Sequence, residues 1–231
     1  MFLCGVGAVL VTVVLAVFPP ALFRRLDNAS YDVLLRSART RPPDSSLVIV
    51  DVDERSLSTI GQWPWRRDLI GDLIARLRDM GARVVALDMV FAEPDRFGDP
   101  GRTGQGAETG ARTNSDEALA ATLRDGRVVL GHAMRFDGVP FDPNACVLHP
   151  VNPAVLHVGD EAADASYFHA TGVVCNLPIL AQAAGASGFM NAAPDEDGIL
   201  RRVPLLMELD GRVYPSLALA ATMAATGASE M

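Results

Sequence analysis

The sequence contains no lysine, so all 20 of its Lys+Arg residues are arginines. This absence excludes Schiff-base chemistry, a lysine general base and the lysine-bearing loops that bind phosphate. Positive charge is also scarce, because 28 acidic residues outnumber the arginines and leave a formal net charge of -8. Duplex nucleic acid needs a basic face, so nucleic acid is not expected as a partner.

Cysteine and histidine are few and scattered. The three cysteines show no C-x-x-C pattern, so no zinc site is predicted, and no motif predicts a cofactor. Cys146 and Cys175 leave two readings open. They form a disulfide outside the cytoplasm, which stabilises by about 3 kcal/mol, or they are free buried thiols. The histidines are interpreted as ordinary core or surface residues: His132, His149, His157 and His169.

A long uncharged run opens the chain. Residues 2–23 are mostly Val, Leu, Ala and Phe, and about 20 such residues suffice to span a membrane. The alternative is a cleaved signal peptide, but no basic residue precedes the run and no clear A-x-A site is present. Residues 1–23 are therefore predicted to be a transmembrane helix. Arg24 and Arg25 follow it, and the positive-inside rule alone would place them in the cytoplasm.

The next 23 residues read as a helix and a linker. Leu22, Leu26, Ala29 and Val33 recur at helical spacing, so the membrane helix is expected to continue as a stalk over residues 21–39. Two prolines in TRPPDSS then end the helix. Residues 24–46 are therefore assigned as a juxtamembrane helix and linker.

Residues 47–91 predict a βαβ unit. Leu47 to Val52 is a β-branched run typical of a strand, SLSTI is a helical turn, and residues 82–91 form the next strand. Between them, residues 66–81 predict an amphipathic helix that Gly81 ends. Its apolar stripe is expected to consist of Leu69, Leu73, Leu77 and Met80. The two strands should be parallel, with a right-handed crossover.

The rest of the chain changes character twice. Residues 97–115 are rich in Gly and Thr and are predicted to be a mobile insert. A helix at 116–123 with Ser115 as N-cap, a strand at 127–134 and a short helix in LPILAQAAG follow. Asp-Gly pairs at 197–198 and 210–211 predict antiparallel turns. The segment SLALAATMAATG predicts a helix near the C-terminus. The fold class is α/β: an N-terminal membrane helix, a parallel βαβ core sheet flanked by helices, and an antiparallel C-terminal extension.

Acids and tryptophans gather where the predicted parallel strands end. Open α/β sheets bind ligands outside the carboxyl ends of their strands, so one ligand-binding rim is predicted there. Its residues are Asp51, Asp53, Trp63, Trp65, Arg66, Asp88, Glu93 and Asp95. The rim suits a divalent cation or a cationic or polar small molecule. The alternative is structural: the acids cap helices, accept turn hydrogen bonds and pair with Arg66 or Arg67.

The order of several segments resembles the type-two CHASE domain, CHASE2. These segments are VIVDVDERSL, GQWPWRR, GARVVALDMVFAEPD, DEALAATLRDGRVVL, GFMNAAPDEDGILRRVPL and YPSLALAA, and together they cover about residues 24–225. The family often has proline where Arg66 stands. The resemblance implies a sensor over residues 47–231, outside the cytoplasm of a cell-membrane receptor, binding an unknown small molecule. It also implies a cyclase or kinase effector elsewhere in the receptor, and it leaves a homodimer open.

Two other functions compete with the sensor. The first is a structural or dimerisation module of such a receptor. The second is a metal-dependent phosphatase in which Asp51 is the nucleophile and Asp53 the acid/base. That chemistry usually needs a lysine near the phosphoryl group, and the sequence has none. The chain is therefore expected not to be an enzyme. Arg201 and Arg202 either reach an anion or pair with Asp195 and Asp197.

Overall fold

The computed structural model describes residues 21–38, 46–97, 115–139, 142, 145–152, 167–195 and 197–228. Contacts divide the chain into two units, Met1–Asp53 and Glu54–Met231, which are taken in turn. Among the described residues, no helix has both the length and the apolar character needed to cross a membrane. The predicted membrane helix at 1–23 and the predicted insert at 97–115 lie almost entirely outside the described residues, and both stay predictions.

The first unit contains the expected helix but not the expected strand. Helix α2 spans Ala21–Ser37 and matches the prediction closely. Residues 47–53 form no regular element, so the strand predicted at Leu47 to Val52 is wrong. Leu47, Val48 and Ile49 are 77%, 76% and 86% exposed. A β-branched run favours an extended backbone, but a strand also needs a hydrogen-bonded neighbour, and none pairs with it among the described residues.

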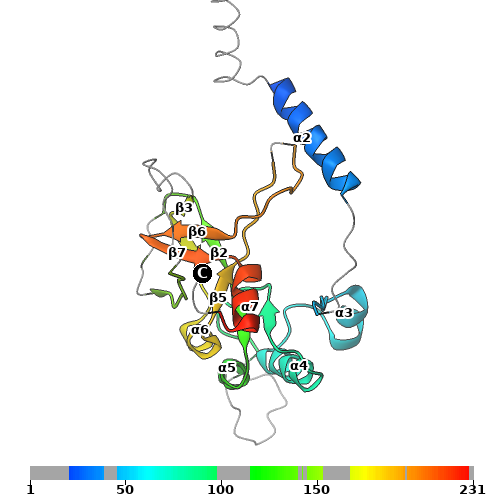
Figure 1. Cartoon of the computed structure of the whole chain (residues 1–231). Helices are drawn as coiled ribbons and strands as arrows, with labels where there is room; N and C mark the ends of the chain where they lie inside the picture. The colour runs from blue at the N-terminus through cyan, green and yellow to red at the C-terminus, as the bar shows by residue number, and fades with distance from the viewer. Residues whose placement is uncertain are drawn as a thin grey trace, which may run out of the picture. The chain divides into compact units, whose positions relative to one another are not determined.

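A parallel sheet forms the centre of the second unit (Figure 1). Strand β2, Val128–Arg135, lies between β1, Val85–Leu87, and β5, Ser187–Phe189, and is parallel to both. Strand β4, Gly172–Val174, pairs antiparallel with the last residues of β2. The parallel core is therefore confirmed, but β1, β2 and β5 supply it, and β1 is shorter than the predicted 82–91 strand.

Five helices of the second unit are described. They are α3 (Glu54–Ile60), α4 (Arg67–Asp79), α5 (Ser115–Arg124), α6 (Pro178–Ala184) and α7 (Leu217–Thr226). Helices α4, α5 and α6 pack in chain order, α5 between the other two, while α7 packs on β1, β2 and β5. Gly185 and Gly227 end α6 and α7 in the left-handed conformation that favours glycine. The prediction of helices flanking a parallel sheet is confirmed.

The buried face of α4 differs from the predicted stripe. Ile70 and Ile74 are the side chains in the core, with Gly71 packed against Thr122 of α5. Met80, which the predicted stripe includes, is 83% exposed. Both sets recur at helical spacing, so periodicity alone does not choose between them. The neighbouring α5 and the sheet determine which face is buried.

A second sheet lies towards the C-terminus. Strands β6, Leu206–Leu209, and β7, Arg212–Pro215, form the predicted antiparallel pair, and β3, Phe168–Ala170, lies parallel to β6. Asp210 and Gly211 join the pair, both with positive φ, as a two-residue hairpin turn requires. The earlier Asp-Gly pair also turns the chain, since the Gly198 N–H donates to the Asp195 carbonyl oxygen. However, no strand flanks it among the described residues.

An apolar cluster joins the two sheets. It contains Met134 of β2, Phe189 of β5, and Met207, Leu209 and Tyr214 of the second sheet. Cys146 and Cys175 pack against this cluster and form a disulfide, with Cα atoms 5.7 Å apart. Of the two readings that the sequence left open, the structure therefore shows the pair.

Candidate functional site

The loop that contains both tryptophans, residues 61–66, joins α3 to α4. The peptide bond between Trp63 and Pro64 is cis, and the two indole rings lie 5.8 Å apart. Trp65 is only 8% exposed, and its Nε1–H donates to the Gly61 carbonyl oxygen at 2.8 Å. Trp63 is 40% exposed. The two residues therefore have different roles: Trp65 holds the loop to the core, and Trp63 offers an aromatic surface to the solvent.

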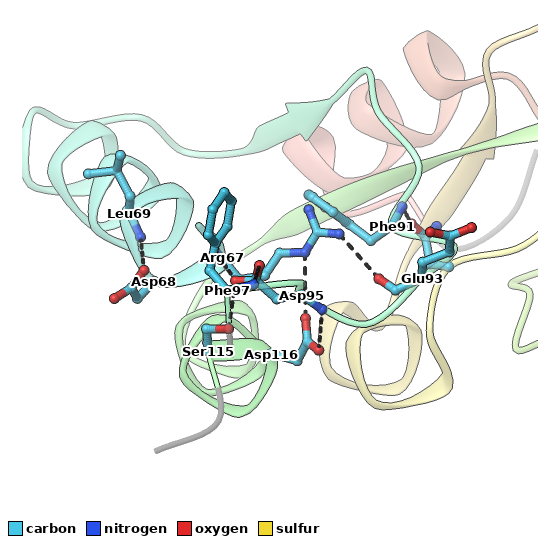
Figure 2. A network of polar contacts seen from close by, with 10 residues as sticks. Arg67, Asp68, Leu69, Phe91, Glu93, Asp95, Phe97, Ser115 and Asp116 are labelled. Atoms are coloured by element: carbon cyan, nitrogen blue, oxygen red, sulfur yellow. Dashed lines mark hydrogen bonds and ion pairs between the residues drawn. The ribbon is translucent and has the colours of Figure 1, made fainter. Parts of the chain in front are cut away.

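Arg67 and Asp95 form the centre of a polar network (Figure 2). Arg67 is the first residue of α4, and its backbone N–H donates to Asp95 Oδ2 at 2.9 Å. A helix leaves its first N–H groups without an internal partner, and a carboxylate there also stabilises the helix dipole. Asp95 thus caps α4 from 28 residues away. The structural alternative for the acids is confirmed at this residue.

The Arg67 side chain lies between the 91–97 segment and the start of α5. Its guanidinium carbon lies 4.3 Å from the centre of the Phe91 ring, and Nη2 donates to the Glu93 carbonyl oxygen at 3.3 Å. Nε lies 3.5 Å from Asp116 Oδ1, and Asp116 Oδ2 accepts from the Asp95 N–H at 3.0 Å. Arg67 therefore ties the 91–97 segment to the start of α5.

The Asp95 carboxylate accepts further hydrogen bonds besides the one from the Arg67 N–H. Ser115 Oγ donates to Oδ2 at 2.6 Å, and the Phe97 N–H donates to Oδ1 at 3.0 Å. Burial opposes ionisation of this carboxyl, but the hydrogen bonds from Ser115, Arg67 and Phe97 and the charge of Arg67 outweigh it. They lower the pKa of Asp95. Ser115, predicted as the N-cap of its helix, instead uses its hydroxyl to hold Asp95.

The side chain of Asn176 binds the backbone of Phe91 in the same region. Its Oδ1 accepts from the Phe91 N–H at 2.8 Å, and its Nδ2 donates to the Gly131 carbonyl oxygen at 2.8 Å. The next residue, Leu177, donates its N–H to the Phe91 carbonyl oxygen at 2.7 Å. Both backbone groups of Phe91 are thus paired with the 176–177 segment.

The other predicted rim residues are exposed. Asp88 follows β1, and Glu93 contributes only its carbonyl oxygen to Arg67, so the carboxylates of both remain exposed. Arg66 forms a two-point ion pair with Asp68, at 2.6 and 3.1 Å. Asp51 and Asp53 are exposed residues of the first unit. The structure therefore brings together Arg67, Glu93 and Asp95, and the ligand-binding role of the predicted rim stays a prediction.

A metal site is not formed by the residues described. Within the described ranges, no group of three or more His, Cys, Asp or Glu side chains is placed to hold a metal ion. The Arg201 side chain is 5% exposed and pairs with Asp195 and with both oxygens of Asp197, at 2.8 to 2.9 Å. The hydrogen bond from Arg201 is the main cause that lowers the pKa of Asp197 to about 2. Of the two roles predicted for Arg201, the structure shows the acid pair.

Sequence reasoning missed the roles of Asn176 and Asp116, and it left open whether His132 is a core or a surface residue. Asp116 and Asn176 matter through partners 21 and 85 residues away, which a local pattern does not reveal. His132 occupies an apolar-looking strand, and only burial distinguishes it from a surface histidine. One signal was available for Asn176: a lone amide within the apolar run VVCNLPIL suggests a buried hydrogen-bonding role.

The fold and site define a mixed α/β domain. Hydrogen bonds with Arg67, Ser115 and Asn176 hold its 91–97 segment, and Trp63 is exposed in the loop before α4. The family model of the CHASE2 domain matches residues 8–231, nearly the whole chain. The chain therefore belongs to the CHASE2 family, which is a family of sensory domains. No curated protein and no solved structure matches the chain significantly.

Proposed function

We propose that this chain is the extracytoplasmic input domain of a membrane-bound signalling receptor, binding a small polar or cationic molecule. The match to the CHASE2 family over residues 8–231 carries this proposal. In it, residues 1–23 anchor the chain in the cell membrane. A cyclase or kinase elsewhere in the receptor responds to the state of the domain. A ligand shifts that state only by its difference in affinity for the two states.

The loop region around Arg67 suits such a role. Trp63 is exposed for stacking or cation–π contact, and the carboxylates of Asp88 and Glu93 are exposed. In the same region of the sequence, Trp65, Asp95 and Arg67 are held by internal hydrogen bonds. An exposed contact surface on a braced support keeps its geometry before the ligand arrives, which lowers the cost of binding.

Thermal unfolding of the detergent-solubilised chain tests this function. Melting is followed with a chelator, with Ca²⁺, with Mg²⁺ and with pooled small metabolites. A molecule that binds only the folded state at about 100 times its Kd adds about 2.7 kcal/mol, or several degrees in Tm. A rise with one metabolite fraction supports the sensor. A rise with none of the additions favours a structural or dimerisation module.

Two tryptophan variants serve as matched controls. Trp63→Ala is expected to lower the melting temperature of the free chain less than Trp65→Ala does, because Trp63 is 40% exposed and Trp65 only 8%, and to abolish the rise with ligand. Trp65→Ala is expected to lower the melting temperature with or without ligand, because it empties a buried site. A ligand response that survives Trp63→Ala unchanged would place the binding site elsewhere.

A further inference from the structure

The disulfide lies next to the residues that hold Phe91 in the candidate site. Cys175 directly precedes Asn176 and Leu177, whose side-chain and backbone groups hold both the N–H and the carbonyl of Phe91. Phe91 is 1% exposed and carries the Arg67 guanidinium on its ring. A displacement of residues 175–177 therefore reaches Arg67 through one intervening residue.

The other half of the disulfide belongs to an irregular segment, residues 145–152, here called the strap. Apart from the disulfide, two residues of the strap form hydrogen bonds with strand residues within the described part of the chain. His149 contacts Ser187 Oγ through its N–H at 3.4 Å and through Nδ1 at 3.1 Å. The Val151 N–H donates to the Val213 carbonyl oxygen at 2.9 Å. Cys146 and Cys175 are both half-buried at the edge of the apolar cluster. The covalent link thus adds to these hydrogen bonds and to the packing of Leu148 against the same cluster.

We propose that the Cys146–Cys175 disulfide is a redox-sensitive latch that couples the strap to the loop region around Arg67. The thiolate of a small thiol or of a protein dithiol outside the membrane attacks one sulfur, which breaks the Cys146–Cys175 bond, forms a mixed disulfide and frees the other cysteine as a thiol. A second thiol of the reductant then attacks the mixed disulfide and frees the remaining cysteine, so the two cysteines gain two electrons and the reductant becomes its own disulfide. Residues 175–177, no longer tied to the strap, then loosen their hold on Phe91. The latch rests on the proposed placement outside the cytoplasm, but it needs no ligand, so its test does not depend on whether a ligand binds.

Hydrogen–deuterium exchange of the whole detergent-solubilised chain, oxidised and dithiothreitol-reduced, tests the latch. Reduction is expected to accelerate exchange at least tenfold in peptides from residues 88–97 and 145–152. Helix α7, Leu217–Thr226, is the internal reference and should change less than threefold. Equal acceleration in α7 and in residues 88–97 would overturn the proposal, because the disulfide would then only stabilise the whole fold. No acceleration in residues 88–97 would overturn it as well.

Three variants separate the latch from side effects. Cys4→Ser leaves the disulfide intact and should reproduce the wild-type response to reductant, so a response lost in it would overturn the assignment. The double variant Cys146→Ser, Cys175→Ser should show the reduced pattern without reductant. Asn176→Ala should loosen residues 88–97 while the disulfide is still formed. Protection of residues 88–97 that survives Asn176→Ala would show that the coupling does not pass through this residue.

Discussion

His132 of β2 is a fully buried histidine, and neither of its ring nitrogens has a hydrogen-bond partner among the described residues. The ring packs edge-on against Tyr214, with centroids 6.4 Å apart. Burial, with a smaller contribution from the charge of His149, lowers the pKa of His132 to about 4. Burial also lowers the pKa of His149. Protonation of either histidine therefore opposes folding.

Acid should destabilise the fold through His132. Its pKa is about 4 when folded and about 6.5 when unfolded, so the unfolded chain binds more protons between these values. The contribution of neutral His132 to the free energy of unfolding is therefore fully present above about pH 6.5, and it is lost as the pH decreases towards 4. From pH 7.5 to 4.5 the expected contribution of His132 to the loss is about 2–3 kcal/mol, measured by urea unfolding followed by tryptophan fluorescence.

Variants of two histidines identify the source of this pH dependence. His132→Phe should reduce the loss between pH 7.5 and 4.5 by about 2–3 kcal/mol, because the new side chain does not titrate. His169→Gln removes an exposed histidine paired with Glu208 and should change the loss by less than about 0.5 kcal/mol. An acid loss that stays the same in His132→Phe would show that this histidine is not its cause.

Asp95 should matter for stability far more than Asp88. Asp95→Asn removes the charge that accepts hydrogen bonds from Ser115, Arg67 and Phe97, and the expected loss is about 2 kcal/mol at pH 7. Because the pKa of Asp95 is lowered in the fold, this contribution is present above about pH 4 and disappears below it. Asp88→Asn, at an exposed site, should cost less than about 0.5 kcal/mol in the same urea titration. Equal losses would refute the capping role of Asp95.

At the scale of elements, the contact between β5 and α7 depends on a glycine. A Cβ added at Gly188 would lie 2.6 Å from the backbone N and Cα of Leu217, at the start of α7. Backbone atoms do not rotate away, so Gly188→Ala must displace the helix from the sheet. We expect a loss of about 3 kcal/mol in urea unfolding.

Gly138 is the matched control for Gly188. A Cβ there meets nothing within 4 Å, but its φ of +72° is unfavourable for alanine. Gly138→Ala should therefore cost about 1 kcal/mol. If both variants lost the same stability, the close approach of α7 to Gly188 would not cost more than the unfavourable φ at Gly138, which would contradict this prediction.

At the scale of the whole molecule, the segment before Glu54 should be a protease site. Val48, Ile49 and Val50 are exposed and belong to no strand. A protease that cleaves after small apolar residues should produce a fragment beginning between residues 48 and 51, identified by N-terminal sequencing. That fragment should keep the tryptophan fluorescence of the intact chain, because the second unit has its own core. Resistance of this segment would show that it is covered in the intact chain.

Local chemistry made much of the fold predictable. Helix α7 ends at Gly227 and α6 at Gly185 because glycine adopts the left-handed conformation at little cost. Asp210 and Gly211 turn β6 into β7 for the same reason. The strand at 127–134 was also found within one residue. The prediction of a strand at 47–52 is wrong because a strand needs a hydrogen-bonded neighbour, and the residues of the segment itself do not specify one.

The candidate site was predictable only in part. The sequence placed Trp65 and Asp95 in one region, but it did not reveal that Trp65 is buried and Trp63 exposed. It offered both a ligand-binding and a capping role for Asp95, and the hydrogen bond to Arg67 confirmed the capping role. Asn176 and Phe91 are 85 residues apart, so only the packed chain brings them together.

By itself, the sequence determined the arginine-only basic character, the α/β class, the resemblance to CHASE2, and most helices and turns. These depend on composition, on residue order, and on backbone preferences that act over a few residues. Only the tertiary structure decided which face of α4 is buried, how Arg67 and Asp95 are paired, that Cys146 bonds to Cys175, and that His132 is buried. Each of these depends on distant segments packing together, and the free energy of packing belongs to the contact and not to either segment alone.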